Sequence, residues 1–184
     1  MDFLEAFCRQ IRLRSSDNKR AFQLLESGDI PSQMVAVLRQ ELDSMIRVIY
    51  FLSQSDMTYR DELIQASVEG KQWIARGKKR RITDKEMVEL ANELHGWTES
   101  VYRFGCAFIH LSGFHDYRER DPMDMISEEE KEAVLKHMRY YHGGPGRVNS
   151  AFKDLIPYLP MAFEKIASNL ECYVKDLEAK KVIE

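Results

Sequence analysis

Two side chains suited to acting on an anionic group occur seven residues apart, Arg103 and His110. A guanidinium binds a phosphate or carboxylate bidentately, and an imidazole can donate and accept protons near neutral pH. On an α-helix this spacing places both side chains on nearly the same line, about 10 Å apart along the axis. The pair is therefore the first candidate for chemistry in this chain.

Both residues lie in an otherwise apolar stretch, residues 101–114, and Glu99 stands one helical turn before Arg103. Two interpretations are open. In the first, Glu99 and Arg103 form an ordinary i,i+4 ion pair at the edge of the core, and His110 hydrogen-bonds a carbonyl. In the second, this face meets a second subunit, so that two Arg–His sets converge in a cleft across a two-fold axis.

Arg103, six intervening residues and His110, in the later part of a long helix of a small α-bundle, resemble the R-x4-6-H signature of the HEPN superfamily. Proteins similar to this pattern are dimeric helical bundles, and many are metal-independent ribonucleases of toxin–antitoxin and phage-defence systems. The resemblance implies a homodimer in which His110 is the general acid or base, Arg103 holds the scissile phosphate, and the RNA 2′-hydroxyl is the nucleophile. Residues 101–117 also resemble a signature of a bacterial family, which implies no particular activity.

Further candidate substrate contacts flank this pair. His115 and Tyr117 follow Gly113, and we expect them near the end of the helix that carries His110, whereas polar capping of that helix is the alternative. The loop at residues 76–81 concentrates five positive charges and is either a contact for RNA phosphates or a solvated connector. Its candidate residues are Lys78, Lys79, Arg80 and Arg81.

Metal and cofactor sites are not expected. His110 with His115, and His137 with His142, are each five residues apart, which on a helix turns the two side chains about 140° away from each other. No Glu-x-x-His motif occurs, so a di-iron carboxylate site is disfavoured. Trp97 is assigned to the core, and a small-molecule pocket within the bundle remains a third functional alternative.

Composition favours one globular helical domain over residues 1–184, with short N-terminal helices in 1–30 and the bundle core in 31–184. A net charge of −3 gives no overall attraction to nucleic acid. No apolar run approaches the roughly 20 residues that span a bilayer, and the acidic N-terminus is unlike a secretory signal. We therefore predict a cytoplasmic protein without membrane contact.

Hydrophobic periodicity predicts an all-α fold, an antiparallel up-and-down bundle of about five to seven helices. Its central element is one long helix over residues 83–113, opened by a capping box of Thr83 and Glu86. Capping boxes also predict helix starts at Thr58 and Ser127, and Ser16 is expected to separate two short helices, 2–14 and 17–27. Apolar residues at three-four spacing mark a further helix, at Val35, Leu38, Leu42, Met45, Ile49 and Leu52.

The long helix is predicted to be amphipathic up to Glu99 and buried on all sides from Val101 onward, apart from Arg103 and His110. A helix buried in this way needs a second packing partner. Two functions follow as hypotheses: a HEPN-like dimeric ribonuclease that uses Arg103 and His110, or a non-catalytic interaction module that binds itself or another helical protein.

Overall fold

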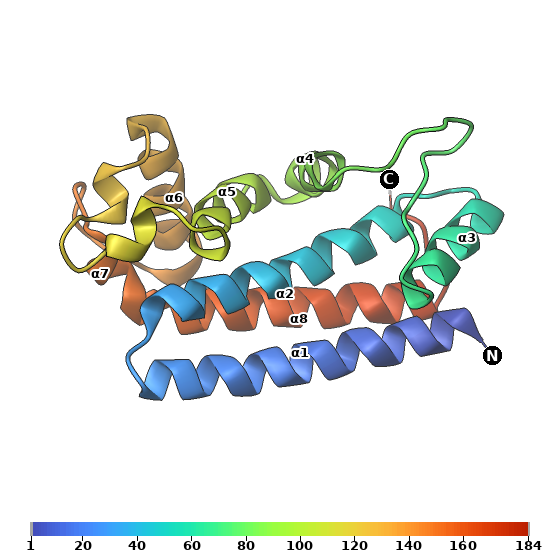
Figure 1. Cartoon of the computed structure of the whole chain (residues 1–184), viewed down its shortest axis with the longest axis horizontal. Coiled ribbons are helices and arrows are strands. Elements are labelled where there is room, and N and C mark those ends of the chain that lie inside the picture. Colours follow the sequence, from blue (N-terminus) through green and yellow to red (C-terminus); the bar gives the residue numbers. More distant parts are fainter. Residues whose placement is uncertain (1, 184) are drawn as a thin grey trace.

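The computed structural model describes residues 2–183, and these form an all-α helical bundle, as predicted (Figure 1). Within the described residues no strand is present, apart from an isolated bridge between Ile74 and Arg81. None of the helices in this part of the chain is long and apolar enough to cross a membrane.

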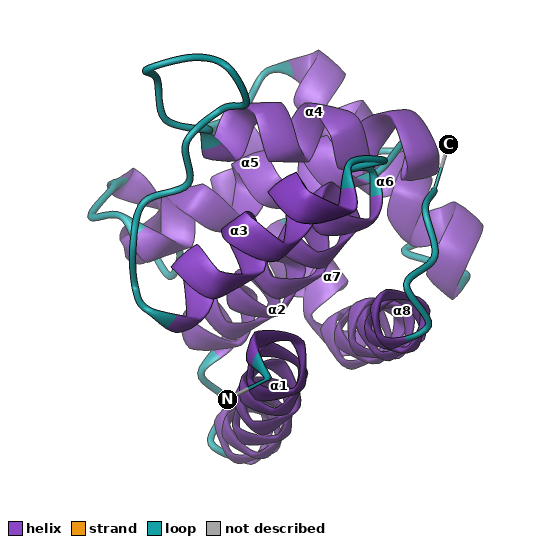
Figure 2. Ribbon diagram, turned by 90° about the vertical axis from the view of Figure 1, so that its right-hand side faces the viewer, coloured by secondary structure: helices purple, strands orange, loops and turns teal. Residues whose placement is uncertain are grey.

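Three long helices form the base of the bundle: α1 (Phe3–Ser27), α2 (Pro31–Leu52) and α8 (Leu159–Glu178). Seen end-on, α1 and α8 lie on one side of α2, and α4 and α5 lie on the other (Figure 2). α1 runs antiparallel to both of its neighbours, whereas α2 and α8 run in the same direction (Figure 1). The simple up-and-down order expected from the sequence therefore does not hold for the pair α2 and α8, which are joined through all of α3 to α7.

The prediction of two short N-terminal helices is wrong, because α1 is one continuous helix of 25 residues capped by Asp2. Serine and asparagine weaken helices when their side chains hydrogen-bond the local backbone. Here they bind α2 instead: Asn18 Nδ2 donates to Glu41 Oε2 over 2.8 Å, and the Ser15 hydroxyl donates to Glu41 Oε1. Glu41 is 0% exposed, so this contact fastens the middle of α1 to the core.

The central helix of the bundle is α2. All six positions predicted from its three-four spacing are buried, which confirms that part of the prediction. Other positions of α2 are buried as well, including Ile46, Val48 and Phe51, whereas Gln33 and Gln40 are exposed. A helix that is apolar over most of its surface is enclosed over most of it, and α2 leaves only a polar strip open to solvent. The chain thus places α2, rather than residues 83–113, at its centre.

The predicted helix over residues 83–113 is two helices, α4 (Asp84–His95) and α5 (Thr98–Ile109). Gly96 separates them with a left-handed φ of +71°, and its N–H donates to the Asn92 carbonyl over 2.7 Å to end α4. The apolar three-four spacing continues across this break, so periodicity alone did not reveal it. Trp97 follows the break and is only 4% exposed, which confirms its assignment to the core.

The remaining helices are α3 (Met57–Val68), α6 (Glu128–His142) and the short α7 (Phe152–Leu155). Capping boxes at Thr83 and Ser127 open α4 and α6 as predicted. The predicted start of α3 at Thr58 is wrong, because the side chain of Asp56 caps this helix by accepting from the Thr58 and Tyr59 N–H groups.

Candidate functional site

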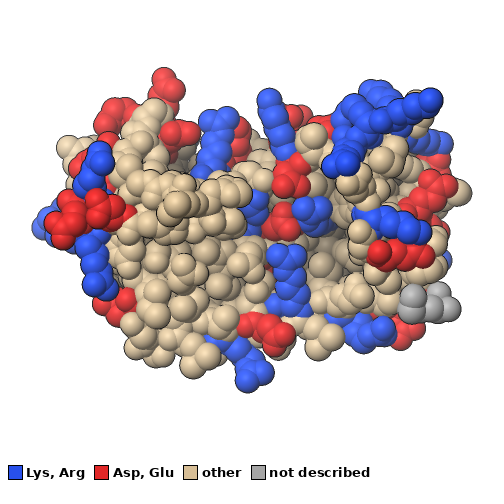
Figure 3. All heavy atoms as spheres, in the orientation of Figure 1, with Lys and Arg blue, Asp and Glu red and all other residues tan. Residues whose placement is uncertain are grey.

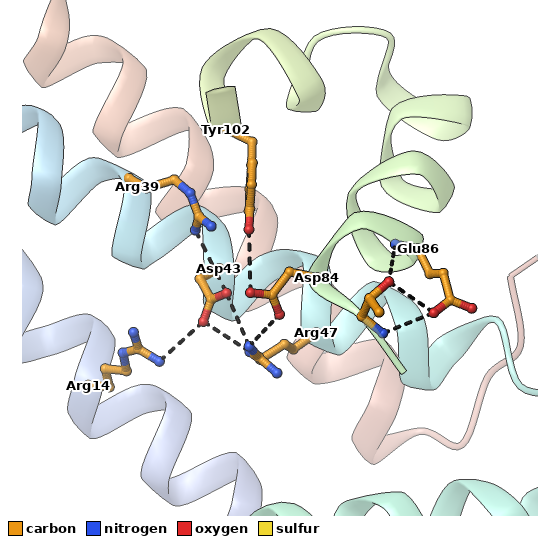
Figure 4. A network of polar contacts seen from close by, with 8 residues as sticks. Arg14, Arg39, Asp43, Arg47, Asp84, Glu86 and Tyr102 are labelled. Atoms are coloured by element: carbon orange, nitrogen blue, oxygen red, sulfur yellow. Dashed lines mark hydrogen bonds and ion pairs between the residues drawn. The ribbon is translucent and has the colours of Figure 1, made fainter. Parts of the chain in front are cut away.

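Polar contacts hold α5 and α4 against α2 (Figure 4). The guanidinium of Arg39, on α2, lies 3.4 Å from the centre of the Tyr102 ring, a cation–π contact. The Tyr102 hydroxyl donates to Asp84 over 3.4 Å, and burial raises the pKa of Tyr102 to about 12, so this hydroxyl keeps its proton. Arg47 bridges Asp43 and Asp84 at 2.9 and 3.1 Å. These contacts set the rotation of α5 about its own axis.

Arg103 lies on the outer side of α5, where 62% of its side chain is exposed. Its Nη2 lies 2.7 Å from Glu99 Oε1, which confirms the predicted i,i+4 ion pair. A second carboxylate, from Glu130 on α6, lies 3.5 Å from Nη1 and was not foreseen. Arg103 is therefore a surface cation held between two acids.

His110 is the first residue beyond α5, where the backbone turns to an extended conformation (φ −92°, ψ 146°). Its side chain is exposed and forms no hydrogen bond within residues 2–183. His115 lies beside it, with Nε2 3.1 Å from the His110 carbonyl oxygen. In the single chain Arg103 and His110 share no hydrogen bond, so any joint action requires a bound substrate or a second copy.

The expectation that residues from Val101 onward are buried on all sides is wrong. Ile109 is 43% exposed and Leu111 is 96% exposed. Because α5 ends at Ile109 and the chain turns away, these side chains project from the end of the helix instead of into a neighbour. The apolar end of α5, residues 109–111, is thus open to solvent.

The other predicted site residues lie elsewhere. The Tyr117 ring packs edge-on against Phe152 at 5.9 Å and lines a separate hollow with Asp121 and Pro31. The basic loop lies at the opposite end of the molecule from the end of α5, where Figure 3 shows its Lys and Arg side chains gathered. In that loop Arg80 pairs with Glu86 at 2.6 Å, whereas Lys78 and Lys79 are exposed. The fold therefore does not bring the loop to Arg103 and His110.

A cavity that the sequence did not predict as a specific site lies between α2, α5, α6 and α8. Its polar lining includes Ser100, His137, His142 and Lys165, and Ser100 Oγ lies 2.9 Å from His137 Nδ1. The sequence places His137 and His142 on one helix, but only the packing of α6 against α5 and α8 turns both toward the same cavity. In residues 2–183 no group of three or more His, Cys, Asp or Glu side chains is arranged to hold a metal ion.

Fold and sites together define an all-α helical bundle with an exposed arginine on α5, an exposed histidine just beyond this helix, and a separate apolar cavity. Comparison of the chain with protein-family models, with curated proteins and with solved structures gives no match.

Proposed function

We propose that this protein is a homodimer joined through the end of α5, and that Arg103 and His110 of both copies form a metal-independent site for RNA cleavage. The observation that supports the dimer is the exposure of Ile109 and Leu111 directly beside His110. Large apolar side chains that gather on a surface favour contact with another protein. Figure 3 adds a broad area without charged side chains where α5 ends above α2.

The ion pairs of Arg103 do not prevent phosphate binding. An exposed i,i+4 pair such as Glu99–Arg103 contributes only about 0.3–0.5 kcal/mol. A phosphodiester accepts two parallel charge-assisted hydrogen bonds from one guanidinium, which is a stronger arrangement. Arg103 can therefore exchange Glu99 for a phosphate.

The chemical step needs no group beyond the two side chains and the substrate. One His110 takes the proton of the RNA 2′-hydroxyl, whose oxygen attacks phosphorus and forms a 2′,3′-cyclic phosphate. The bond to the 5′-oxygen breaks, and the His110 of the second copy protonates this leaving oxygen. Arg103 holds the phosphate as charge develops on its oxygens.

Light scattering and RNA cleavage in the presence of EDTA test both parts. We expect a dimer that cleaves RNA, a dimer without cleavage for His110→Ala, and a monomer without cleavage for Leu111→Glu. Val148→Glu is the matched control, because Val148 is 78% exposed on the loop after α6. It should remain dimeric and active. Unchanged cleavage by His110→Ala would overturn the catalytic role.

A non-catalytic interaction module that self-associates through the same surface is the second candidate. It is favoured by Glu99 and Glu130, whose two carboxylates beside Arg103 repel an incoming phosphate. A wild-type dimer that leaves RNA intact, together with a monomeric Leu111→Glu variant, would support this candidate. A monomeric wild-type protein would contradict both.

A further inference from the structure

The cavity between α2, α5, α6 and α8 is apolar over most of its surface and has a volume of about 70 Å³. Its apolar lining includes Trp97, Val101, Phe104, Met138, Tyr141 and Leu159. A single buried water needs about 10–15 Å³ and two or more polar partners. The cavity is several times larger than that and offers few such partners, but it is smaller than a cavity of roughly 150 Å³ that accommodates benzene, so it suits a short aliphatic chain better than water or an aromatic ring.

The break between α4 and α5 builds one wall of this cavity. The left-handed turn at Gly96 directs the next residue, Trp97, inward. His95, just before the turn, accepts or donates a hydrogen bond with the Tyr173 hydroxyl over 2.9 Å, and this contact anchors the turn to α8. The Trp97 ring then meets the Tyr141 ring edge-on, with ring centres 6.4 Å apart.

The Ser100 hydroxyl and the His137 imidazole in the cavity lining form a hydrogen bond with each other. Ser100 Oγ donates to the Trp97 carbonyl oxygen over 2.9 Å and lies 2.9 Å from His137 Nδ1. Burial lowers the pKa of His137, and likewise the pKa values of His142 and the adjacent His95. These imidazoles are accordingly uncharged at neutral pH.

Lys165 is the cavity's one formally charged lining residue at neutral pH among those described, and it lacks a counter-ion. Its Nζ lies 4.2 Å from the centre of the Tyr141 ring, and Lys165 as a whole is half-buried. Elsewhere on α8, Lys175 pairs with Glu171 at 3.9 Å and Glu164 pairs with Lys19 at 2.7 Å, whereas Lys165 forms no ion pair within residues 2–183. Its positive charge also contributes to the lowered pKa of His95 and His142.

We propose that this cavity binds a small carboxylic acid, with its apolar body beside Trp97 and Tyr141 and its carboxylate on Lys165. An apolar cavity with one placed charge is typical of small-molecule sites. A carboxylate supplies the missing counter-ion through a charge-assisted hydrogen bond, which a neutral molecule of the same shape cannot do. This site is separate from Arg103 and His110 and does not depend on the proposed dimer.

The test titrates propionate, butyrate and pentanoate into the protein and follows the indole N–H resonance of Trp97 in a Trp73→Phe background, which removes the only other tryptophan. For at least one acid we expect saturable shifts with a dissociation constant on the order of 1 mM or below, as ligands of this size allow. Butyramide, the neutral counterpart of butyrate, should bind about tenfold more weakly.

Two lysine variants isolate the role of the charge. Lys165→Met should weaken binding of the acid about tenfold, whereas Lys175→Met, on the same helix but outside the cavity, should leave it unchanged. Ala162→Leu, which fills the cavity, should abolish binding, and circular dichroism reports whether this variant remains folded.

The proposal is overturned if none of the three acids binds, if butyramide binds as tightly as butyrate, or if Lys165→Met binds like the wild type. Leu111→Glu should still bind the acid, so failure of the dimer proposal and failure of this one are separately visible.

Discussion

Gly105 of α5 lies directly against Arg39 of α2. A Cβ atom on residue 105 would lie 2.7 Å from the Arg39 Cβ, closer than two non-bonded carbons can stand. The missing side chain lets α5 approach α2 closely enough for Tyr102 to cover the Arg39 guanidinium. One glycine thus sets the position of the helix that carries Arg103.

We expect Gly105→Ala to lower the free energy of unfolding by about 1–3 kcal/mol, because the added methyl group overpacks the contact between α5 and α2. Alanine otherwise favours a helix, so the sign of the effect is diagnostic. Chemical denaturation measures it. Gly146→Ala is the control, since a Cβ there meets no atom within 4 Å. A Gly105→Ala protein as stable as the wild type would contradict the close contact.

Glu41→Ala should destabilise the protein by roughly 2–4 kcal/mol, because it leaves the buried Asn18 amide and Ser15 hydroxyl without an acceptor. Glu41→Gln should cost less, since the amide oxygen still accepts one hydrogen bond. Amide hydrogen exchange should show that the residues of α1 lose protection first. Unaltered protection of α1 in Glu41→Ala would show that this contact does not hold the helix.

Gly96→Ala should cost about 1 kcal/mol or slightly more, because alanine is strained at the φ of +71° that ends α4. No atom lies within 4 Å of the added Cβ, so the cost is conformational rather than steric contact with a neighbour. Asparagine tolerates this conformation better, and Gly96→Asn should therefore be the milder change. Thermal unfolding of both variants measures which of them is more stable. A Gly96→Asn protein less stable than Gly96→Ala would count against a conformational origin of the cost.

Stability should fall as the pH is lowered from 7.5 toward 5.5. Burial lowers the pKa of His95, His137 and His142 below the ordinary value of 6.5, so the unfolded chain binds more protons than the folded one in this window. The loss begins above pH 6.5, as the imidazoles of the unfolded chain start to bind protons, and is complete below the folded pKa values. The free energy of unfolding, measured across this range, should depend less steeply on pH in His95→Gln than in the wild type. A wild-type stability that rises on acidification would contradict the lowered pKa values.

Local interactions made several features predictable from the sequence. The capping boxes at Thr83 and Ser127 involve residues three apart, so they form without a contact from a distant segment. The same holds for the i,i+4 pair of Glu99 and Arg103. The apolar spacing of α2 likewise identified buried positions, because a helix with this pattern must bury its apolar face against a neighbouring element, whichever element that is.

Contacts between distant segments decided the rest. α1 is continuous because Ser15 and Asn18 bind Glu41, which lies on another helix. The cavity exists because α6 and α8 bring His137 and Lys165 to the wall that Trp97 forms after the turn at Gly96.

The sequence by itself determined the all-α class, two helix starts and the i,i+4 ion pair of Glu99 and Arg103. Only the tertiary structure decided that Leu111 is exposed, that Arg103 meets a second carboxylate from Glu130, and that Lys165 lines an apolar cavity between α2, α5, α6 and α8. The physical reason is that hydrophobic periodicity indicates the direction in which a side chain points from its own helix. Its exposure and its ion pairs depend on which other helix packs against that side.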